Sequence, residues 1–488
     1  MNFKLVLRIV GFSLLIEAAA MVLPLAVSLI YGEDPAPFLY TIAILLAVGC
    51  AAAFLLKGKN NFFAREGFFT VGLIWVLFSA FGALPFRFSG LFGNYVNCFF
   101  ECVSGFTTTG SSILTAIEGL PYGLLFWRSF THWLGGMGVL VLTAALLPSL
   151  GISSNHLIRA ESPGPVKSKL VPRASQSSKI LYTIYLALTV LQTVILRIAG
   201  MPWFDSIVHA FGTAGTGGFG IKNTSIAFYQ SPAIEIIITV FMLLFSINFA
   251  MYFLLLTRRF KQVLKSDELR FFLIVVFVSI ALISINIIPQ FPTAGDAIRA
   301  AAFQVASIIS TTGFSTADFN LWPVFSKMLL VILMLIGACA GSTGGGMKWS
   351  RILVLFRSAK REIVSIVHPR SVQVVQLDGD PLPEKTVRTT QSFFIIYLFI
   401  IFVAALLISL DNFSFPTTIT AVIACISNIG PGLDAVGPMG NFSAFSPWSK
   451  LLLSFNMLVG RLEIFPMLLL FAPSIWKRRI VRHAAPLK

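Results

Sequence analysis

Four short polar turns, each containing a glycine, recur along this chain and constrain its fold more than any other feature. They lie at residues 107–111, 216–219, 310–314 and 427–431. Each follows a short, mostly apolar segment and precedes a much longer one. Because glycine adopts φ above zero without steric cost, consecutive carbonyls of such a turn can point to one side. Four copies predict a four-fold pore, in which a ring of carbonyl oxygens replaces the hydration shell of a cation.

The composition predicts an all-α polytopic membrane protein. The chain has 488 residues, of which 56% are hydrophobic and only 11% are charged, and its mean hydropathy is +0.86. Runs of about 20 uncharged residues at this composition exclude a soluble domain. The net charge of +16 does not indicate nucleic-acid binding, because the basic residues lie between the apolar segments.

Ten segments are long enough to span a membrane, at residues 9–30, 37–56, 67–84, 124–147, 180–200, 232–257, 271–290, 324–347, 392–410 and 450–473. Four shorter segments interrupt them, at 94–106, 204–214, 296–309 and 416–427. At about 1.5 Å per residue, these reach only about halfway through a ~30 Å hydrocarbon core, as re-entrant helices do. Asp205, Asp296 and Pro416 are the expected helix starts. The negative end of each helix dipole then lies beside a turn and favours a cation.

The basic residues predict the orientation and the organisation. Most of the 36 Lys and Arg fall in segments that ten spans place on one side of the membrane, and the positive-inside rule makes this side the cytoplasm, with both termini on it. We expect two leading transmembrane helices at 1–60. Four fused units of helix, half-helix, turn and helix follow, at 61–150, 151–262, 263–370 and 371–488.

The turns supply the candidate cation-coordinating residues, which are Thr108, Thr109, Gly110, Thr216, Gly217, Gly218, Thr311, Thr312, Gly313, Asn428, Ile429 and Gly430. One such turn is weak support for a filter, because small residues also let membrane helices pack closely. Four turns that each follow a half-helix and face the same side favour a selectivity filter. The fourth turn departs from the Thr-Thr-Gly pattern, which argues against strict four-fold equivalence.

A glycine-rich run at 337–348 lies at the middle and inner end of the expected span 324–347. Each glycine there destabilises a helix by up to ~1 kcal/mol relative to alanine, so a break is predicted. A flexible loop below a filter would gate it; the alternative is a kink or a close packing contact. A nucleotide-binding loop is disfavoured, because no Ser or Thr follows the lysine and no strand precedes the run. The candidate gate residues are Gly337, Gly341, Ser342, Thr343, Gly344, Gly345, Gly346 and Lys348.

Arg461 lies about midway along the last expected span and is the remaining gate candidate. An intramembrane arginine is costly and faces a partner or a water-filled cavity. Facing the conduction path, it would raise a barrier to cations. The alternative is a pair with Glu463 or another buried carboxylate that serves helix packing. The histidines are scattered and no Cys, His or paired-acid set converges, so the sequence does not predict an enzyme.

These motifs resemble the superfamily of K+ transporters that includes TrkH, KtrB and plant HKT proteins, and within it the TrkH family over nearly the whole chain. The resemblance rests on residues 127–128, 133–138, 266–270, 341–348 and 460–465, and on the two leading helices. It implies that the filter glycines are Gly110, Gly218, Gly313 and Gly430, that the gating loop is 337–348 and that the pore arginine is Arg461.

The resemblance also implies a function and partners. It implies a homodimer in a bacterial inner membrane, with one pore per subunit. It implies permeation by K+ and Rb+, weaker exclusion of Na+ than in a channel with four TVGYG loops, and a cytoplasmic nucleotide-binding regulator similar to TrkA. We therefore expect gated, passive K+ uptake driven by the membrane potential, with no organic cofactor on this chain. The alternative is a K+ symporter coupled to H+ or Na+.

Overall fold

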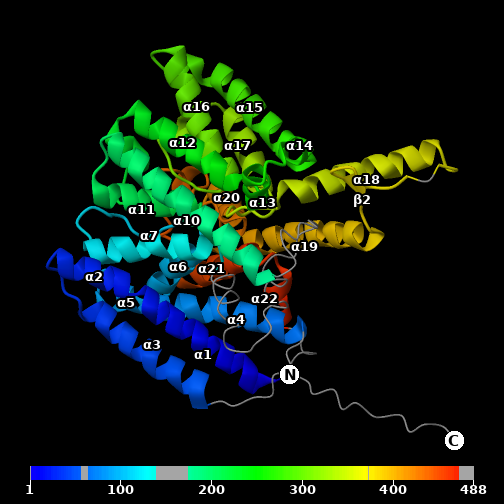
Figure 1. The fold of residues 1–488 in the computed structure, drawn as a ribbon. Helices are drawn as coiled ribbons and strands as arrows, with labels where there is room; N and C mark the ends of the chain where they lie inside the picture. Colours follow the sequence, from blue (N-terminus) through cyan, green and yellow to red (C-terminus); the bar gives the residue numbers. More distant parts are fainter. Residues whose placement is uncertain (1, 56–63, 139–173, 372, 472–488) are drawn as a thin grey trace, which may run out of the picture.

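The computed structural model describes residues 2–55, 64–138, 174–371 and 373–471, and over these residues the chain is helical apart from one short hairpin (Figure 1). Six helical segments in this part of the chain are long and apolar enough to cross a membrane. They are α1 (Phe3–Ala20) with α2 (Val22–Ile30), α3 (Ala36–Leu55), α4 (Ala64–Gly82) with α5 (Leu84–Phe88), α10 (Ala174–Ile198), α15 (Asp267–Ile287) and α19 (Glu384–Ile408). They coincide with six of the ten predicted spans.

Four short helices occupy the segments predicted to be half-length. They are α6 (Tyr95–Phe106), α11 (Trp203–Ala214), α16 (Ala294–Ile309) and α20 (Phe415–Ser427). Each ends at a glycine turn, so the negative ends of four helix dipoles gather at the turns. The side chain of Asn94 caps α6, and Pro416 lies in the first turn of α20 as predicted.

Two of the half-helices begin two residues before the acids predicted as their starts. Thr293 caps α16, where its hydroxyl accepts from the Asp296 N–H at 3.1 Å. Pro202 precedes α11, and Asp205 lies in the first turn, where its carboxylate accepts from the Tyr229 hydroxyl at 2.6 Å. Both acids still lie near the positive end of a helix dipole, which is why they resembled caps in the sequence.

The helices that follow the four turns are short, and three of them are interrupted within the described residues, so the prediction of ten continuous spans is wrong at three places. These helices are α7 (Tyr122–Gly136), α12 (Pro232–Ser246), α17 (Val324–Ile336) and α21 (Pro447–Arg461). With 13 to 15 residues each, they are too short to cross a membrane alone. The end of the predicted span 124–147 lies outside the described residues.

Each described break has a local cause. The backbone turns by 92° between α12 and α13 (Phe249–Leu256), where the Asn248 side chain accepts from the Ala250 N–H and caps the new helix. Gly337 ends α17 with φ of +74°. Between α21 and α22 (Phe465–Leu470), Ile464 has φ of +68°. None of these conformations continues an α-helix.

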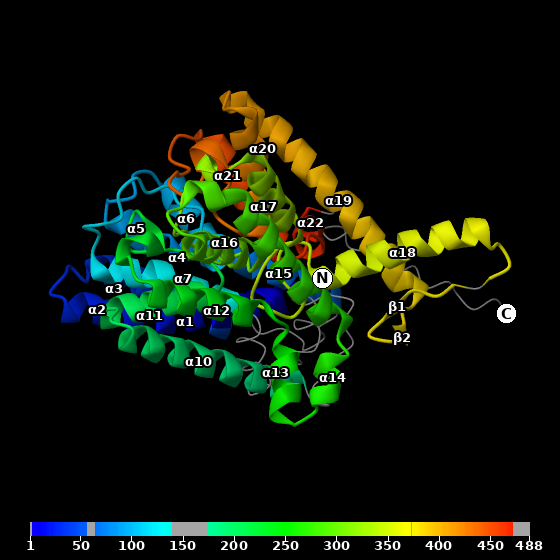
Figure 2. The ribbon, with the colours of Figure 1, turned by 90° about the horizontal axis from the view of Figure 1, so that it is seen from above.

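The helix α18 (Trp349–Val367) leaves the bundle beside the N-terminal half of α19 (Figure 2). It leads to the antiparallel hairpin of β1 (Gln376–Leu377) and β2 (Asp380–Pro381). The short α14 (Phe260–Leu264) precedes α15. Loops carry the 3-10 helices η2 (Ser225–Tyr229), η3 (Ile288–Gln290), η4 (Phe319–Leu321), η5 (Ser409–Asp411) and η6 (Asp434–Val436).

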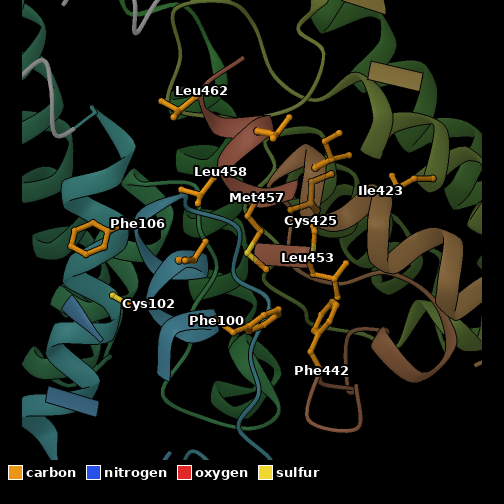
Figure 3. Packing of buried hydrophobic residues seen from close by; sticks show 14 of the residues in the cluster. Phe100, Cys102, Phe106, Ile423, Cys425, Phe442, Leu453, Met457, Leu458 and Leu462 are labelled. Carbon is orange, nitrogen blue, oxygen red and sulfur yellow. The ribbon is translucent and has the colours of Figure 1, made fainter. Parts of the chain in front are cut away.

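The largest hydrophobic core joins the first half-helix to the last part of the chain (Figure 3). Phe100 and Phe106 of α6 and Leu453 and Met457 of α21 are almost completely buried in it. The helices α6 and α21 are in contact. Burying these side chains brings the first and fourth turns together, so the turns close into a ring.

Candidate cation filter and gate

All four glycine turns have the same backbone conformation. In each turn, φ is positive at the glycine and at the residue two positions before it. These pairs are Thr108 (56°) and Gly110 (81°), Thr216 (55°) and Gly218 (75°), Thr311 (60°) and Gly313 (85°), and Asn428 (56°) and Gly430 (96°). The residue between them lacks this positive φ. This alternation turns successive carbonyls toward one side, as in filters built from backbone oxygens.

The same hydrogen bond ends each half-helix. The backbone N–H of the residue before the glycine donates to the carbonyl five residues earlier, as in a Schellman motif. The four bonds are Thr109 to Ser104 (2.8 Å), Gly217 to Gly212 (2.9 Å), Thr312 to Ser307 (2.8 Å) and Ile429 to Ala424 (3.0 Å). The fourth turn therefore matches the others in backbone although it departs from them in sequence.

Asn428 explains how the fourth turn keeps this conformation. Asparagine adopts positive φ more readily than most residues, because its short side chain bonds locally. Its amide donates to the Thr109 hydroxyl at 2.9 Å and to the Met457 carbonyl at 3.0 Å. Asn428 thus ties the fourth turn to the first turn and to α21.

The glycines bring the turns into a closed ring. A Cβ built on Gly110 would lie 2.0 Å from the Gly217 carbonyl oxygen, and one on Gly218 would lie 2.0 Å from that of Thr312. One on Gly313 would lie 2.1 Å from the Ile429 oxygen. The circle closes because a Cβ on Gly430 would lie 2.8 Å from the Thr109 oxygen. No side chain fits at these positions, so backbone oxygens line the ring.

A buried ion pair holds the first two turns in place. Nε of Arg128 donates to the Glu101 carboxylate at 2.6 Å, and both side chains are almost fully buried. The guanidinium also donates to the Gly220 carbonyl at 2.8 Å and lies 3.6 Å from the centroid of the Phe219 ring. Glu101 in turn accepts from the Ile113 N–H at 2.9 Å. The pair connects α6 to the chain that leaves the first and second turns.

We expect Arg128→Ala to destabilise the protein by about 3 to 5 kcal/mol, because it leaves the Glu101 charge buried without its partner. The loss is measured from the thermal unfolding midpoint in detergent. The double variant Glu101→Gln with Arg128→Met removes both charges and is expected to recover much of this loss. An equal loss in the single and double variants would show that packing, and not the ion pair, is the source of the stability.

The glycine-rich loop 337–348 lies directly against the third and fourth turns. The Gly345 N–H donates to the Thr311 hydroxyl at 2.7 Å. A Cβ on Gly345 would lie 2.4 Å from the Ser427 carbonyl oxygen, and one on Gly344 would lie 2.9 Å from that of Ser310. The sequence predicted the break and a loop below the filter, and the structure adds the contacts of this loop with the ends of α16 and α20.

The chain breaks that follow α12 and α17 form hydrogen bonds with each other's backbone groups. The Thr343 hydroxyl donates to the Phe245 carbonyl at 3.1 Å, and the Cys339 N–H donates to that of Ser246 at 3.1 Å. In return, the Phe249 N–H donates to the Gly341 carbonyl at 2.9 Å. Irregular backbone at membrane depth needs such partners. Gly341 lies close to Asn248, since a Cβ built on it would be 2.9 Å from the Asn248 side-chain oxygen, and the Ser342 hydroxyl donates to the Cys339 carbonyl at 2.6 Å.

Arg461 contacts the loop and the end of α7. Its guanidinium donates to the Thr343 carbonyl at 2.8 Å and to the Gly136 carbonyl at 2.7 Å. Glu463 forms its ion pair with Arg351, so the alternative in which Arg461 pairs with Glu463 is wrong. Carbonyls at a helix C-terminus are favourable acceptors for a cationic side chain.

Lys348 adds a second positive charge at this point. Its side chain is buried, and its ammonium group donates to the Gly344 carbonyl. Lys348 and Arg461 are close enough to interact electrostatically. In a site of reduced dielectric, these two charges oppose the entry of a third cation.

Sequence reasoning missed two contributors to this arrangement. The carbonyls of Phe245 and Ser246 anchor the loop, and Asn248 is the polar residue in this apolar run that marks the break. Glu268 also binds the loop, since its carboxylate accepts from the Ala340 N–H at 2.7 Å. A signal was present here, because an acid at the start of an apolar span is costly unless it has a partner.

Comparison with known proteins agrees with this architecture. A family model described as a cation transport protein, TrkH, matches residues 36–478. This chain belongs to the TrkH family. It is therefore a multi-pass membrane protein of a transport family and not an enzyme.

Relatives in the TrkH family match along almost their whole length. The Trk system potassium uptake protein TrkH of Salmonella typhimurium is 39% identical over 490 residues, which cover 98% of this chain and 100% of that protein. TrkG of Escherichia coli is 33% identical, with 98% and 99% covered. The crystal structure of the potassium transporter TrkH from Vibrio parahaemolyticus superimposes with a TM-score of 0.87 at 34% identity, covering 98% of this chain and 100% of that one.

Proposed function

We propose that this chain is the membrane subunit of a potassium uptake system, in which K+ and Rb+ pass through the ring of turn carbonyls. The observation that supports this most is the ring itself, where each glycine lies against a carbonyl of the next turn. Four half-helices direct the negative ends of their dipoles toward it. The relatives named as potassium uptake proteins support K+ as the transported ion.

The loop 337–348 is the gate of this pore in our proposal, and its contacts with the turns are those of a closed gate in that proposal. The loop contacts the third and fourth turns, and Arg461 and Lys348 place positive charge beside it. Opening requires the loop to leave the turns. The multiple glycines lower the cost of that change, because they populate more backbone conformations than other residues.

The membrane potential supplies the driving force. An inside-negative potential of about 100 mV is worth ~2.3 kcal/mol per charge, enough for roughly 50-fold accumulation without ATP hydrolysis by this chain. A K+ symporter coupled to H+ or Na+ is the alternative. Flux that reverses with voltage alone, whatever the Na+ or pH gradient, excludes coupling.

The remaining parts of the proposal concern assembly and topology. We place both termini in the cytoplasm of a bacterial inner membrane and divide the chain into two leading helices and four units. We propose a homodimer and a cytoplasmic nucleotide-binding regulator similar to TrkA, on the support of the family alone. In this orientation α18 and the hairpin extend into the cytoplasm, where a regulator can reach them.

Uptake of radioactive Rb+ into liposomes that hold the purified protein tests the proposal. Under a negative-inside potential, we expect shortening of the loop at 341–346 to raise uptake about ten-fold or more, because a gate held by several hydrogen bonds is removed. Protein-free liposomes provide the background. If neither the full-length nor the shortened protein takes up Rb+ above this background, the chain is not a pore.

A further inference from the structure

The first turn of α15 contains two adjacent acids, Asp267 and Glu268, which contact different parts of the chain. Glu268 is 6% exposed and faces the loop 337–348. Asp267 faces the cytoplasmic hairpin. Both belong to the segment 266–270, which the proposed filter and gate do not use. Because they are neighbours at the start of one helix, a displacement of either backbone position moves the other.

Glu268 joins the loop to the helix that follows it. Its Oε1 accepts from the Ala340 N–H at 2.7 Å and from the Ser350 N–H at 2.9 Å. Ala340 lies in the first half of the loop, and Ser350 lies in the first turn of α18. Hydrogen bonds to an ionised acceptor are among the stronger ones. One oxygen atom therefore sets the separation between the loop and the start of α18.

Asp267 joins the same helix end to the hairpin. Its N–H donates to Oδ1 of Asp378 at 2.7 Å, and its own Oδ2 accepts from the Asp378 N–H at 2.9 Å. Arg357 of α18 donates to Oδ2 of Asp267 at 2.8 Å and to the Gln376 carbonyl at 2.6 Å. The hairpin, α18 and the start of α15 are thus held together by bonds that all include Asp267 or Arg357.

We propose that Glu268 is a positioning residue that holds the loop 337–348 in its closed conformation, and that the Asp267–Asp378 contact links this hold to the cytoplasmic hairpin. This rests on the proposed function, since it assigns the control of the same gate. A cytoplasmic partner that pulls the hairpin away from α15 would move Asp267 and Glu268 together. The loop would then lose its bond at Ala340 and become free to leave the turns.

Substitutions at Glu268 separate a hydrogen-bonding role from a charge role. In Glu268→Gln, the amide oxygen still accepts from both N–H groups but carries no charge, so Rb+ uptake rises less than in the two variants that lose these bonds. Glu268→Asp keeps the charge but shortens the side chain, and Glu268→Ala removes the acceptor. We expect both to raise uptake about ten-fold, since each loses bonds to a buried acceptor. If Glu268 acts only through its charge, for example toward Lys348, Rb+ uptake is instead higher in Glu268→Gln than in Glu268→Asp.

Native cysteines report whether the loop alone has moved. Cys339 lies in the loop and Cys425 in α20, and both are buried, whereas Cys50 is exposed. In a Cys50→Ser background, we expect Glu268→Asp and Glu268→Ala to make Cys339 reactive toward a water-soluble maleimide while Cys425 stays protected. Reaction at both cysteines shows that the variant has unfolded generally. If Glu268→Ala does so, the reactivity of Cys339 is compared in Glu268→Asp and Asp378→Ala instead.

Asp378→Ala tests the link to the hairpin. The substitution removes the acceptor for the Asp267 N–H and leaves the loop unchanged. We expect Rb+ uptake and Cys339 reactivity to rise about two- to five-fold. This rise is smaller than for Glu268→Ala, because only one exposed hydrogen bond is lost. Unchanged uptake in Glu268→Asp and Glu268→Ala, when the loop-shortened protein conducts, would overturn the role of Glu268. Unchanged values in Asp378→Ala alone would overturn the link. Absence of uptake in every variant, the loop-shortened one included, refutes the pore itself.

Discussion

Gly313→Ser is expected to reduce the discrimination between K+ and Na+ by about ten-fold or more, which corresponds to ~1.4 kcal/mol of differential binding. Gly313 has φ of +85°, and a Cβ there would lie 2.1 Å from the Ile429 carbonyl oxygen. This contact cannot exist, so the carbonyl must leave the ring or the third turn must change conformation. Either change alters the number and spacing of oxygens around the ion, on which selection depends.

The measurement is the ratio of Rb+ to Na+ uptake in liposomes, taken at the same imposed potential. Gly200→Ser is the matched control, because Gly200 also has positive φ, +99°, but no atom lies within 4 Å of a Cβ built there. Backbone strain costs about 1 to 3 kcal/mol in both variants. Only Gly313→Ser disturbs the ring. An unchanged ion ratio in a folded Gly313→Ser protein would remove the third turn from the filter.

Arg461→Ala is expected to raise Rb+ uptake about ten-fold or more in the absence of any regulator. Arg461 joins the Thr343 carbonyl of the loop to the Gly136 carbonyl of α7, at 2.8 and 2.7 Å. Hydrogen bonds from charged groups contribute about 1.5 to 3 kcal/mol each, so their loss shifts the loop toward the open state. The substitution also removes a positive charge from the path of the cation.

Arg461→Lys separates these two effects. Lysine keeps the charge but lacks the planar fork that reaches two carbonyls at once. If the bridge to the loop dominates, uptake in the lysine variant approaches that of Arg461→Ala. If the charge dominates, uptake in the lysine variant remains near that of the unaltered protein. Uptake that falls in both variants would show that Arg461 supports conduction and does not restrain it.

The sequence predicted the half-helices well because their signals are local. A short apolar run, a proline or a small polar cap at its start, and a glycine turn at its end determine α6, α11, α16 and α20 without reference to the rest of the chain. The helices after the turns were predicted less well. Their composition is that of a continuous span, and the signals at their ends, such as Asn248 and Pro466, also occur within continuous membrane helices.

The sequence indicated candidate residues for the site without their contacts. The sequence identified the loop 337–348 and Arg461, yet it left open whether they touch. Its alternative was a pair of Arg461 with Glu463 or another buried carboxylate. The structure pairs Glu463 with Arg351 of α18 instead. The helix α21 ends at Arg461, and Glu463 lies in the following break with φ of +53°, where its side chain reaches α18.

The sequence by itself determined that this protein is an all-helical membrane protein with four glycine turns, because apolar length and glycine content act through local backbone energetics. Only the tertiary structure decided that the turns close into one ring and that the loop lies against it. Those facts depend on α6 packing against α21, and on broken helices that exchange hydrogen bonds across more than 90 residues of chain, as between Phe245 and Thr343. Such non-local contacts have no periodic signal in the sequence, because they follow from how complete helices fill space together.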